Sequence, residues 1–158
     1  MSSKAVFVDS SILIEYYKNT QTALLDKLLD TQHIQVCISQ IVVSEYLFHC
    51  LGIDGGKSPL SVKQAKSIAT VLSNGNHAVF LKQFSYLQDS NLLVERVPEL
   101  MSQYNLLPND ALILSLCQIH QIPAVASYDT DFKNACVGLN IALLQNVSDY
   151  NNFLKDNH

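Results

Sequence analysis

Five short apolar segments, separated by stretches with helical spacing, constrain the fold of this chain most strongly. The clearest of them, KAVFV at residues 4–8, is a continuous run of β-forming residues, which favours a strand covered on both faces. Strands that alternate with helices predict an α/β fold, a three-layer α/β/α sandwich around a central, mainly parallel sheet. The predicted strands cover residues 4–8, 34–39, 92–97, 123–127 and 140–146.

The intervening segments predict helices, and the 158 residues fit one domain over 1–158. A Ser/Asp cluster at residues 9–11 opens the first helix. The clearest break is at residues 52–60, which hold three glycines and a proline. We expect helices near residues 12–19, 21–30, 40–51, 61–73, 76–88, 98–104 and 111–121, and a polar helix at the C-terminal end.

Composition excludes several classes of protein. No apolar run reaches the ~18 residues of a membrane span, and Asp9 interrupts the only apolar stretch near the N-terminus, so we expect a cytoplasmic protein without a signal peptide. Cysteines without close pairing indicate small core residues rather than a zinc site, and the scattered histidines indicate surface or helix-face positions. The cysteines are Cys37, Cys50, Cys117 and Cys136.

The charge balance is unfavourable for non-specific binding of nucleic acid. The net charge is −4 and Arg96 is the sole arginine, whereas such binding depends on neutralising phosphates with Lys and Arg. A nucleic-acid substrate would have to be held locally, through bound metal or through the modest cluster of Lys57, Lys63 and Lys66. A cluster of that size is typical of a solvated helix face.

Two acidic residues follow predicted strands. Asp9 follows the first strand, and Asp129 follows the strand at 123–127. Ligands of open α/β sheets bind beyond the carboxyl ends of the strands, so the two carboxylates would come within reach of one ion. Alternatively, Asp9 caps the next helix and Asp129 makes a turn, which are common roles for aspartate.

Two further acidic residues lie on apolar helices. Glu45 lies in IVVSEYLFHCL, which is apolar around most of its circumference and therefore predicts a buried helix. An unpaired carboxylate there is costly, so Glu45 lies either on a narrow solvated stripe with Ser44 or in a cavity that holds cations. Asp110 either caps the helix that follows it or belongs to the same site. Carboxylates that converge without basic partners require divalent metal, and oxygen ligands suit Mg²⁺ or Mn²⁺.

Three blocks of the sequence resemble the PIN domain family in order, spacing and local context. They are VFVDSSILIEYY, ISQIVVSEYLFH and PNDALILSLCQIHQIPAVASYDTDF. The chain looks more narrowly like the VapC-type toxins of toxin–antitoxin operons. The resemblance runs from Asp9 to Phe132, with residues 52–90 as its least typical part.

The resemblance implies roles for individual residues. Asp9, Glu45 and Asp110 would be catalytic metal ligands, followed by Asp129 as first choice and Asp131 as second for the acid of the last turn. Small polar side chains would support this site by hydrogen bonding, namely Ser11, Asn109 and Ser127. The implied activity is Mg²⁺-dependent endoribonuclease cleavage of RNA, with Mn²⁺ as a substitute. The implied partners are a cognate antitoxin protein and a second copy in a homodimer.

Two other readings of the acidic residues stay open. A non-catalytic PIN-like domain would bind RNA or protein through an inactive acidic pocket. A haloacid-dehalogenase-like phosphatase is suggested by Asp129-Thr130-Asp131, although that motif normally follows the first strand, which here precedes Asp9-Ser10-Ser11.

Overall fold

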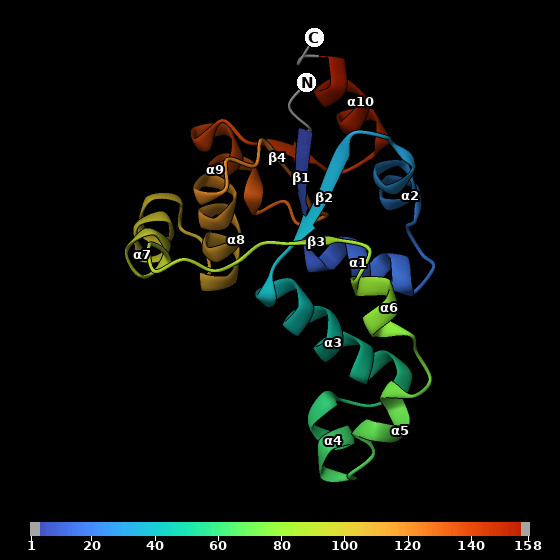
Figure 1. The fold of residues 1–158 in the computed structure, drawn as a ribbon. Coiled ribbons are helices and arrows are strands. Elements are labelled where there is room, and N and C mark those ends of the chain that lie inside the picture. Colours follow the sequence, from blue (N-terminus) through green and yellow to red (C-terminus); the bar gives the residue numbers. More distant parts are fainter. Residues whose placement is uncertain (1–3, 156–158) are drawn as a thin grey trace.

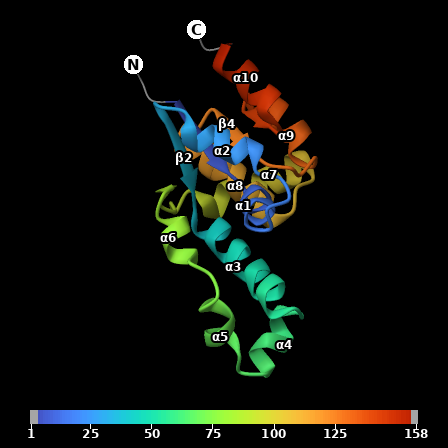
Figure 2. The ribbon, with the colours of Figure 1, turned by 90° about the vertical axis from the view of Figure 1, so that its right-hand side faces the viewer.

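The computed structural model describes residues 4–155, which form a five-stranded sheet with helices on both sides (Figures 1 and 2). All four strand pairs are parallel, in the order β3-β2-β1-β4-β5. The predicted three-layer α/β fold is therefore confirmed, and the sheet is wholly parallel. The strands are β1 (Lys4–Val8), β2 (Ile34–Ile38), β3 (Ser85–Tyr86), β4 (Ala124–Ala126) and β5 (Ala142–Leu144).

The chain changes direction across the sheet between β1 and β4. From β1 it moves outward through β2 to β3, and it then returns to the other side of β1 to form β4 and β5. Val8 at the end of β1 lies beside Ala126 at the end of β4. Because ligands bind at such a switch point in open α/β sheets, the loops after β1 and β4 mark the place to look for a site.

Ten helices occupy the described residues. Parallel connections of this kind are right-handed, so α1 and α2 cover one face of the sheet and α7, α8 and α9 the other. Contacts of α2 with β2 and α10, and of α9 with β5, fit this division. The helices are α1 (Ser10–Tyr17), α2 (Ala23–Asp30), α3 (Gln40–Gly55), α4 (Pro59–Gln64), α5 (Ile68–Leu72), α6 (His77–Leu81), α7 (Leu93–Tyr104), α8 (Pro108–Ile119), α9 (Phe132–Leu139) and α10 (Val147–Lys155).

The core lies around β1 and β4, whose central residues are fully buried by helices on both faces. All four cysteines are free and buried, which confirms their assignment as small core residues. His77 lies on helix α6, within the expected surface or helix-face positions, but it is buried, with 6% of its surface exposed. Its Nδ1 lies 3.1 Å from the Tyr46 hydroxyl, and a tyrosine that can share a hydrogen bond makes this burial tolerable.

The predicted strand at 92–97 is wrong, because residues 93–97 belong to helix α7 and Leu92 is its N-cap residue. Val94, which suggested a strand, is 78% exposed, whereas the residues packed inward recur at helical spacing. Pro98 lies inside α7, where the helix tolerates it despite the missing N–H. The inward residues are Leu93, Val97, Leu100, Met101 and Tyr104.

The segment between β2 and β3 also differs from its prediction. Helix α3 continues past residue 51 to Gly55, the helix predicted at 61–73 is divided into α4 and α5, and α6 covers only part of 76–88. The third strand follows α6 as β3, a two-residue strand at Ser85–Tyr86. A strand this short carries no periodicity, so the sequence offered no signal for it.

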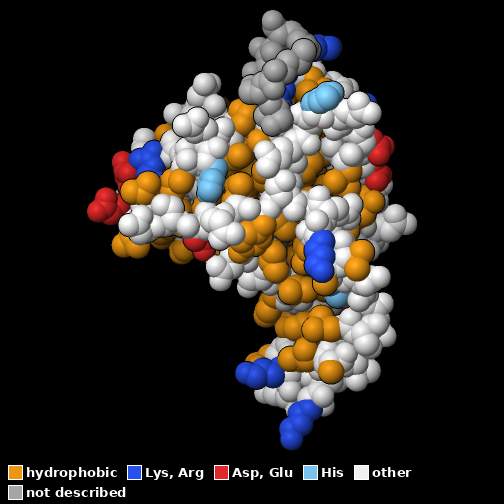
Figure 3. All heavy atoms as spheres, viewed as in Figure 1, with side chains coloured by type: hydrophobic (Ala, Val, Ile, Leu, Met, Phe, Trp, Pro, Cys, Tyr) orange, Lys and Arg blue, Asp and Glu red, His pale blue; other side chains and the backbone are white. Residues whose placement is uncertain are grey.

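Helices α3, α4 and α5 form an arm that extends away from the sheet (Figures 1 and 2). The expected full burial of α3 is wrong, because Phe48 is 58% exposed and Ile53 is 41% exposed. Hydrophobic side chains are visible along the arm in Figure 3. Within residues 4–155, no helix is both long and apolar enough to cross a membrane.

Candidate active site

A cleft of about 420 Å³ opens at the carboxyl ends of β1 and β4, at the switch point of the sheet. Helices α1, α3 and α8 and the loop after β4 all contribute side chains to it. Four of the predicted carboxylates, from Asp9, Glu45, Asp110 and Asp129, meet in this cleft. Its lining consists of Asp9, Ser10, Ser11, Ile14, Glu15, Lys18, Glu45, His49, Asp110 and Asp129.

Asp9 is held rigidly at the end of β1. Its backbone N–H donates to the Ala126 carbonyl (3.0 Å), which ties the end of β1 to β4. Its carboxylate is 6% exposed, and Oδ2 accepts hydrogen bonds from the hydroxyls of Ser11 and Ser127, both at 2.7 Å. Asp9 is the N-cap residue of α1, yet its side chain makes no capping hydrogen bond. The carboxylate is therefore fixed by the two serines and does not serve to cap the helix.

Ser127 connects Asp9 to the loop that carries Asp129. It is fully buried, and its Oγ accepts a hydrogen bond from the Asp129 N–H (3.0 Å) while donating to Asp9. Asp129 then turns the chain, because its Oδ1 accepts from the Asp131 N–H (2.8 Å). Asp129 thus makes a turn and lines the cleft, whereas Asp131 is the N-cap residue of α9 and is absent from the lining.

Glu45 is half-buried, and its carboxylate accepts hydrogen bonds from two uncharged side chains. Its Oε2 accepts from the Ser10 hydroxyl (2.8 Å), and its Oε1 accepts from the Asn109 side-chain amide (2.5 Å). These contacts join α3 to the start of α1 and to the first turn of α8. Of the two alternatives for Glu45, the structure supports a carboxylate that faces a shared acidic cleft.

Asp110 lies in the first turn of α8 and experiences the combined field of the other acids. Burial, and after it repulsion from Asp129, Asp9, Glu45 and Asp131 in that order of strength, together raise its pKa from 3.8 to about 6. Among residues 4–155, none of these five carboxylates forms an ion pair with Lys, Arg or His. The cleft therefore concentrates negative charge that no side chain neutralises.

The donor set fits a hard divalent cation. Carboxylate oxygens are the preferred ligands of Mg²⁺ and Mn²⁺, and a cation would offset the repulsion that raises the pKa of Asp110. In the described part of the chain, no group of three or more His, Cys, Asp or Glu side chains is placed so that it could hold a metal ion. Mg²⁺ usually keeps several waters and binds only one or two carboxylates, so an incomplete protein cage suits this ion.

The raised pKa of Asp110 predicts how stability depends on pH without metal. Its folded-state pKa lies above the unfolded value, so its ionisation destabilises the fold as pH rises from about 4 to about 6. We expect Asp110→Asn to raise the free energy of unfolding by about 1 kcal/mol at neutral pH, the full shift being reduced because the carboxyl reaches solvent. Urea unfolding in EDTA measures this gain, which should vanish near pH 4. An equal gain at both pH values would contradict the electrostatic explanation.

Loss of the Ser127 hydroxyl should weaken both the fold and the site. Ser127→Ala removes a donor to Asp9 and leaves the Asp129 N–H without its acceptor. We expect a loss of about 1–3 kcal/mol in the free energy of unfolding, measured by urea titration. Ser102→Ala, at an exposed position on α7, should change it by less than about 0.5 kcal/mol. A Ser127→Ala protein as stable as the control would show that these bonds contribute nothing.

Five residues that line the cleft were not predicted from the sequence, namely Ser10, Ile14, Glu15, Lys18 and His49. Ser10 donates a hydrogen bond to Glu45, a role that the Ser/Asp cluster at residues 9–11 did not indicate. His49 lies four residues after Glu45 on α3, a spacing that brings both side chains to one helix face. Lys18 also lines the cleft and pairs with Glu15 (2.9 Å). The lysines at 57, 63 and 66 are exposed in and beside α4 and do not line the cleft.

Comparison with known families agrees with this geometry. The sequence model of the PIN domain matches residues 6–138, so the chain belongs to the PIN domain family. Within that family it is a homologue of the VapC ribonucleases. It is 32% identical over 135 residues to ribonuclease VapC2 of Methanocaldococcus jannaschii, covering 84% of this chain and 90% of the relative.

Solved structures share the fold at lower identity. One is a toxin–antitoxin complex from Klebsiella pneumoniae, with a TM-score of 0.55, 21% identity, and coverage of 81% of this chain and 90% of that chain. Another is VapC20 of Mycobacterium tuberculosis, a toxin that cleaves the sarcin–ricin loop, with a TM-score of 0.55, 17% identity, and coverage of 82% and 94%. At these identities the likeness shows the PIN-like fold.

Proposed function

We propose that this protein is a Mg²⁺-dependent endoribonuclease of VapC type and the toxin of a toxin–antitoxin pair. The observation that carries the proposal is the meeting of four carboxylates, without a cationic partner among the described residues, in one cleft at the switch point. Its homology to the VapC ribonucleases supports the same activity.

Asp9, Asp110 and Asp129 would hold the metal, with Glu45 beside them. Asp9 is the most rigid of the group, because two serine hydroxyls fix one of its oxygens. Asp110 lies on the first turn of α8, and Asp129 is positioned by its own turn and by Ser127. We rank Asp131 below Asp129, since Asp131 does not line the cleft.

Bound Mg²⁺, or Mn²⁺ in its place, supplies the Lewis acidity that activates water and stabilises charge on the scissile phosphate. The side chains of the chain itself orient these groups. Glu45, held by Ser10 and Asn109, lies where it can accept a proton from water at the cleft. No side-chain nucleophile is needed, and the expected products carry a 5′-phosphate and a free 3′-hydroxyl.

The cleft offers little positive charge to RNA. Lys18, already paired with Glu15, and His49 are the basic side chains that line it. Since phosphate neutralisation by Lys and Arg drives general affinity for RNA, we expect weak binding without metal and a strong dependence of binding on the ion.

The proposed partners follow from relatives of known structure. The Klebsiella pneumoniae relative is a toxin–antitoxin complex, and a Rickettsia felis VapBC2 structure contains a promoter DNA fragment. We propose that this chain likewise pairs in the cytoplasm with an antitoxin that blocks the cleft, and that it forms a homodimer. A PIN-like domain that binds RNA or protein without cleaving it is the alternative, and intact carboxylates argue against it.

A cleavage assay tests the proposed activity. Purified protein is incubated with structured RNA in Mg²⁺, Mn²⁺ or EDTA, and the ends of the fragments are determined. We expect cleavage only with divalent metal, leaving 5′-phosphates. RNA binding without cleavage in either metal would favour the non-catalytic alternative, and cleavage that persists in EDTA would contradict the metal-dependent mechanism.

A further inference from the structure

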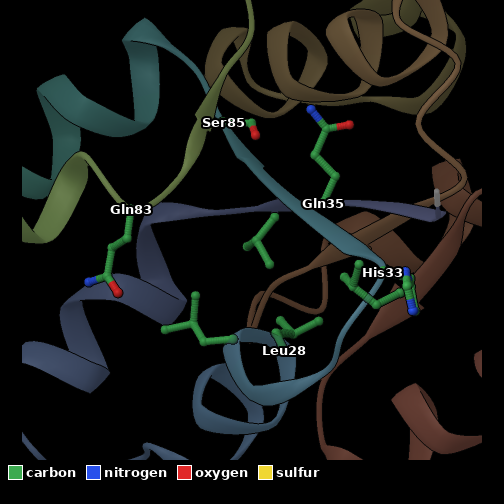
Figure 4. Close-up of a pocket in the computed structure, with 8 residues that line it drawn as sticks. Leu28, His33, Gln35, Gln83 and Ser85 are labelled. Atoms are coloured by element: carbon green, nitrogen blue, oxygen red, sulfur yellow. The ribbon is translucent and has the colours of Figure 1, made fainter.

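A second concavity, of about 530 Å³, lies along the outer edge of β2, away from the acidic cleft. In Figure 4, Leu28 of α2 and Gln35 lie on opposite sides of β2, while Gln83 and Ser85 lie on the segment that leads into β3. We call this concavity the β2-edge groove. It is lined by Leu28, Leu29, His33, Ile34, Gln35, Val36, Gln83 and Ser85.

The groove exists because β3 is shorter than β2. β3 pairs only with Cys37 and Ile38, whereas β1 pairs with β2 from Ile34 onward. The first half of β2 therefore has a neighbour on one side only within residues 4–155. This leaves a three-residue open edge at 34–36, beside the point where β3 begins.

The open edge presents backbone groups that can bind another strand. The Leu87 N–H donates to the Ile38 carbonyl (2.9 Å), so the peptide groups of Ile38 face β3. Peptide groups alternate sides along a strand, and those of Ile34 and Val36 therefore face outward as well. In the described part of the chain, the Val36 N–H and both groups of Ile34 have no backbone partner on that side.

The edge also lacks the usual protection against strand pairing. Natural edge strands are guarded by lysines, prolines or bulges, and none of the residues that line the groove carries a permanent charge or is proline. An N–H without a hydrogen-bond partner is costly where water reaches it poorly, and Val36 as a whole residue is 7% exposed. A strand bound here would satisfy that N–H.

We propose that the β2-edge groove binds a short, extended and uncharged segment of another protein by strand addition to β2. In this arrangement the bound backbone accepts from the Val36 N–H and exchanges hydrogen bonds with Ile34, in line with β3. An apolar side chain of the segment then packs on the partly exposed Leu29, and its neighbours meet the polar rim formed by Gln83 and Ser85.

The dimensions of the groove favour a peptide segment over a second copy of the chain. A stable dimer buries about 800 Å² on each partner, far more than three strand residues and one concavity supply. The groove is also bounded at one end by the start of β3 at Ser85, which limits the added strand to a few residues. The absence of charged lining favours an uncharged segment.

Amide hydrogen exchange tests the proposal with the whole chain and a defined probe. The probe is a blocked hexapeptide of alternating Thr and Val, and the control is the same peptide with alternate amides methylated. We expect exchange at the Val36 amide to slow by about tenfold or more at saturating probe, and not with the methylated control, since each new hydrogen bond contributes about 1 kcal/mol. Unchanged exchange at Val36, or equal effects of both peptides, would overturn the proposal.

Variants locate the binding and separate it from catalysis. Leu29→Lys, and Gln83→Lys at the rim if the first fails to fold, should weaken probe binding by about tenfold, because each places a lysine charge, which guards natural edge strands, in a groove without permanent charge. Leu60→Lys, at an exposed position on α4, should not change it. Protection of Val36 that grows with protein concentration would show a second copy in the groove and contradict the proposal. Leu29→Lys should leave RNA cleavage unchanged, so the two functions fail separately.

Discussion

Replacement of Asp9 by Asn is expected to reduce metal-dependent RNA cleavage by about a thousandfold or more, since a lost metal ligand removes roughly 4 kcal/mol of transition-state stabilisation. Asp9 is the most buried acid of the cleft, and its position is fixed by Ser11, Ser127 and the Ala126 carbonyl. No neighbouring carboxylate can move into its place, because each is held by its own element. Single-turnover cleavage of a labelled RNA measures the effect.

The same variant should fold normally. Asn keeps an oxygen that accepts from a serine hydroxyl, and its neutrality lowers the repulsion on Asp110. We therefore expect an unchanged or higher melting temperature without metal. Asp89→Asn, which neutralises an exposed carboxylate outside the cleft, is the matched control and should cleave at the unmodified rate. Full activity of Asp9→Asn would contradict its role as a ligand.

Asp129→Asn and Asp131→Asn should differ sharply, although the two residues lie in one turn. Asp129 lines the cleft and ranks first among the neighbouring charges that raise the pKa of Asp110, whereas Asp131 ranks last and does not line the cleft. We expect Asp129→Asn to reduce cleavage by about a hundredfold or more, and Asp131→Asn by less than about tenfold. Cleavage rates at several Mg²⁺ concentrations measure both effects.

The Mg²⁺ dependence distinguishes a ligand from a structural residue. If Asp129 binds the ion, Asp129→Asn should require more Mg²⁺ for its residual activity, and Asp131→Asn should not. The turn itself is preserved in Asp129→Asn, because the amide oxygen can still accept from the Asp131 N–H. A larger loss in Asp131→Asn than in Asp129→Asn would reverse the assignment.

The carboxylates could be predicted from the sequence because their positions follow from strand ends. Asp9 directly follows the apolar run of β1, and Asp129 follows β4 by a short loop. In a parallel sheet these ends meet at one edge, so proximity follows from the pattern alone. Glu45 was signalled by an apolar helix around it, even though α3 is more exposed than that pattern implied.

The errors arose where local pattern and tertiary context disagree. The residues LLVERV resemble a strand because they include β-branched side chains. In the structure they begin helix α7, which packs along α8. The helical spacing of the inward residues becomes visible only when the segment is extended to Tyr104. β3 was missed because two residues carry no period. Ser10 and His49 were missed since a serine or histidine beside an acid becomes informative only through the contacts it makes.

We propose that the cleft binds a divalent cation through Asp9, Asp110 and Asp129, and crystals soaked in Mn²⁺ would reveal such an ion. Anomalous scattering locates the ion independently of activity. We expect an anomalous peak in the cleft, coordinated by the carboxylate oxygens of Asp9 and of Asp110, Asp129 or both. An anomalous map with no peak in the cleft at millimolar Mn²⁺, or with its peak bound by Asp131 without Asp9, would contradict the proposal.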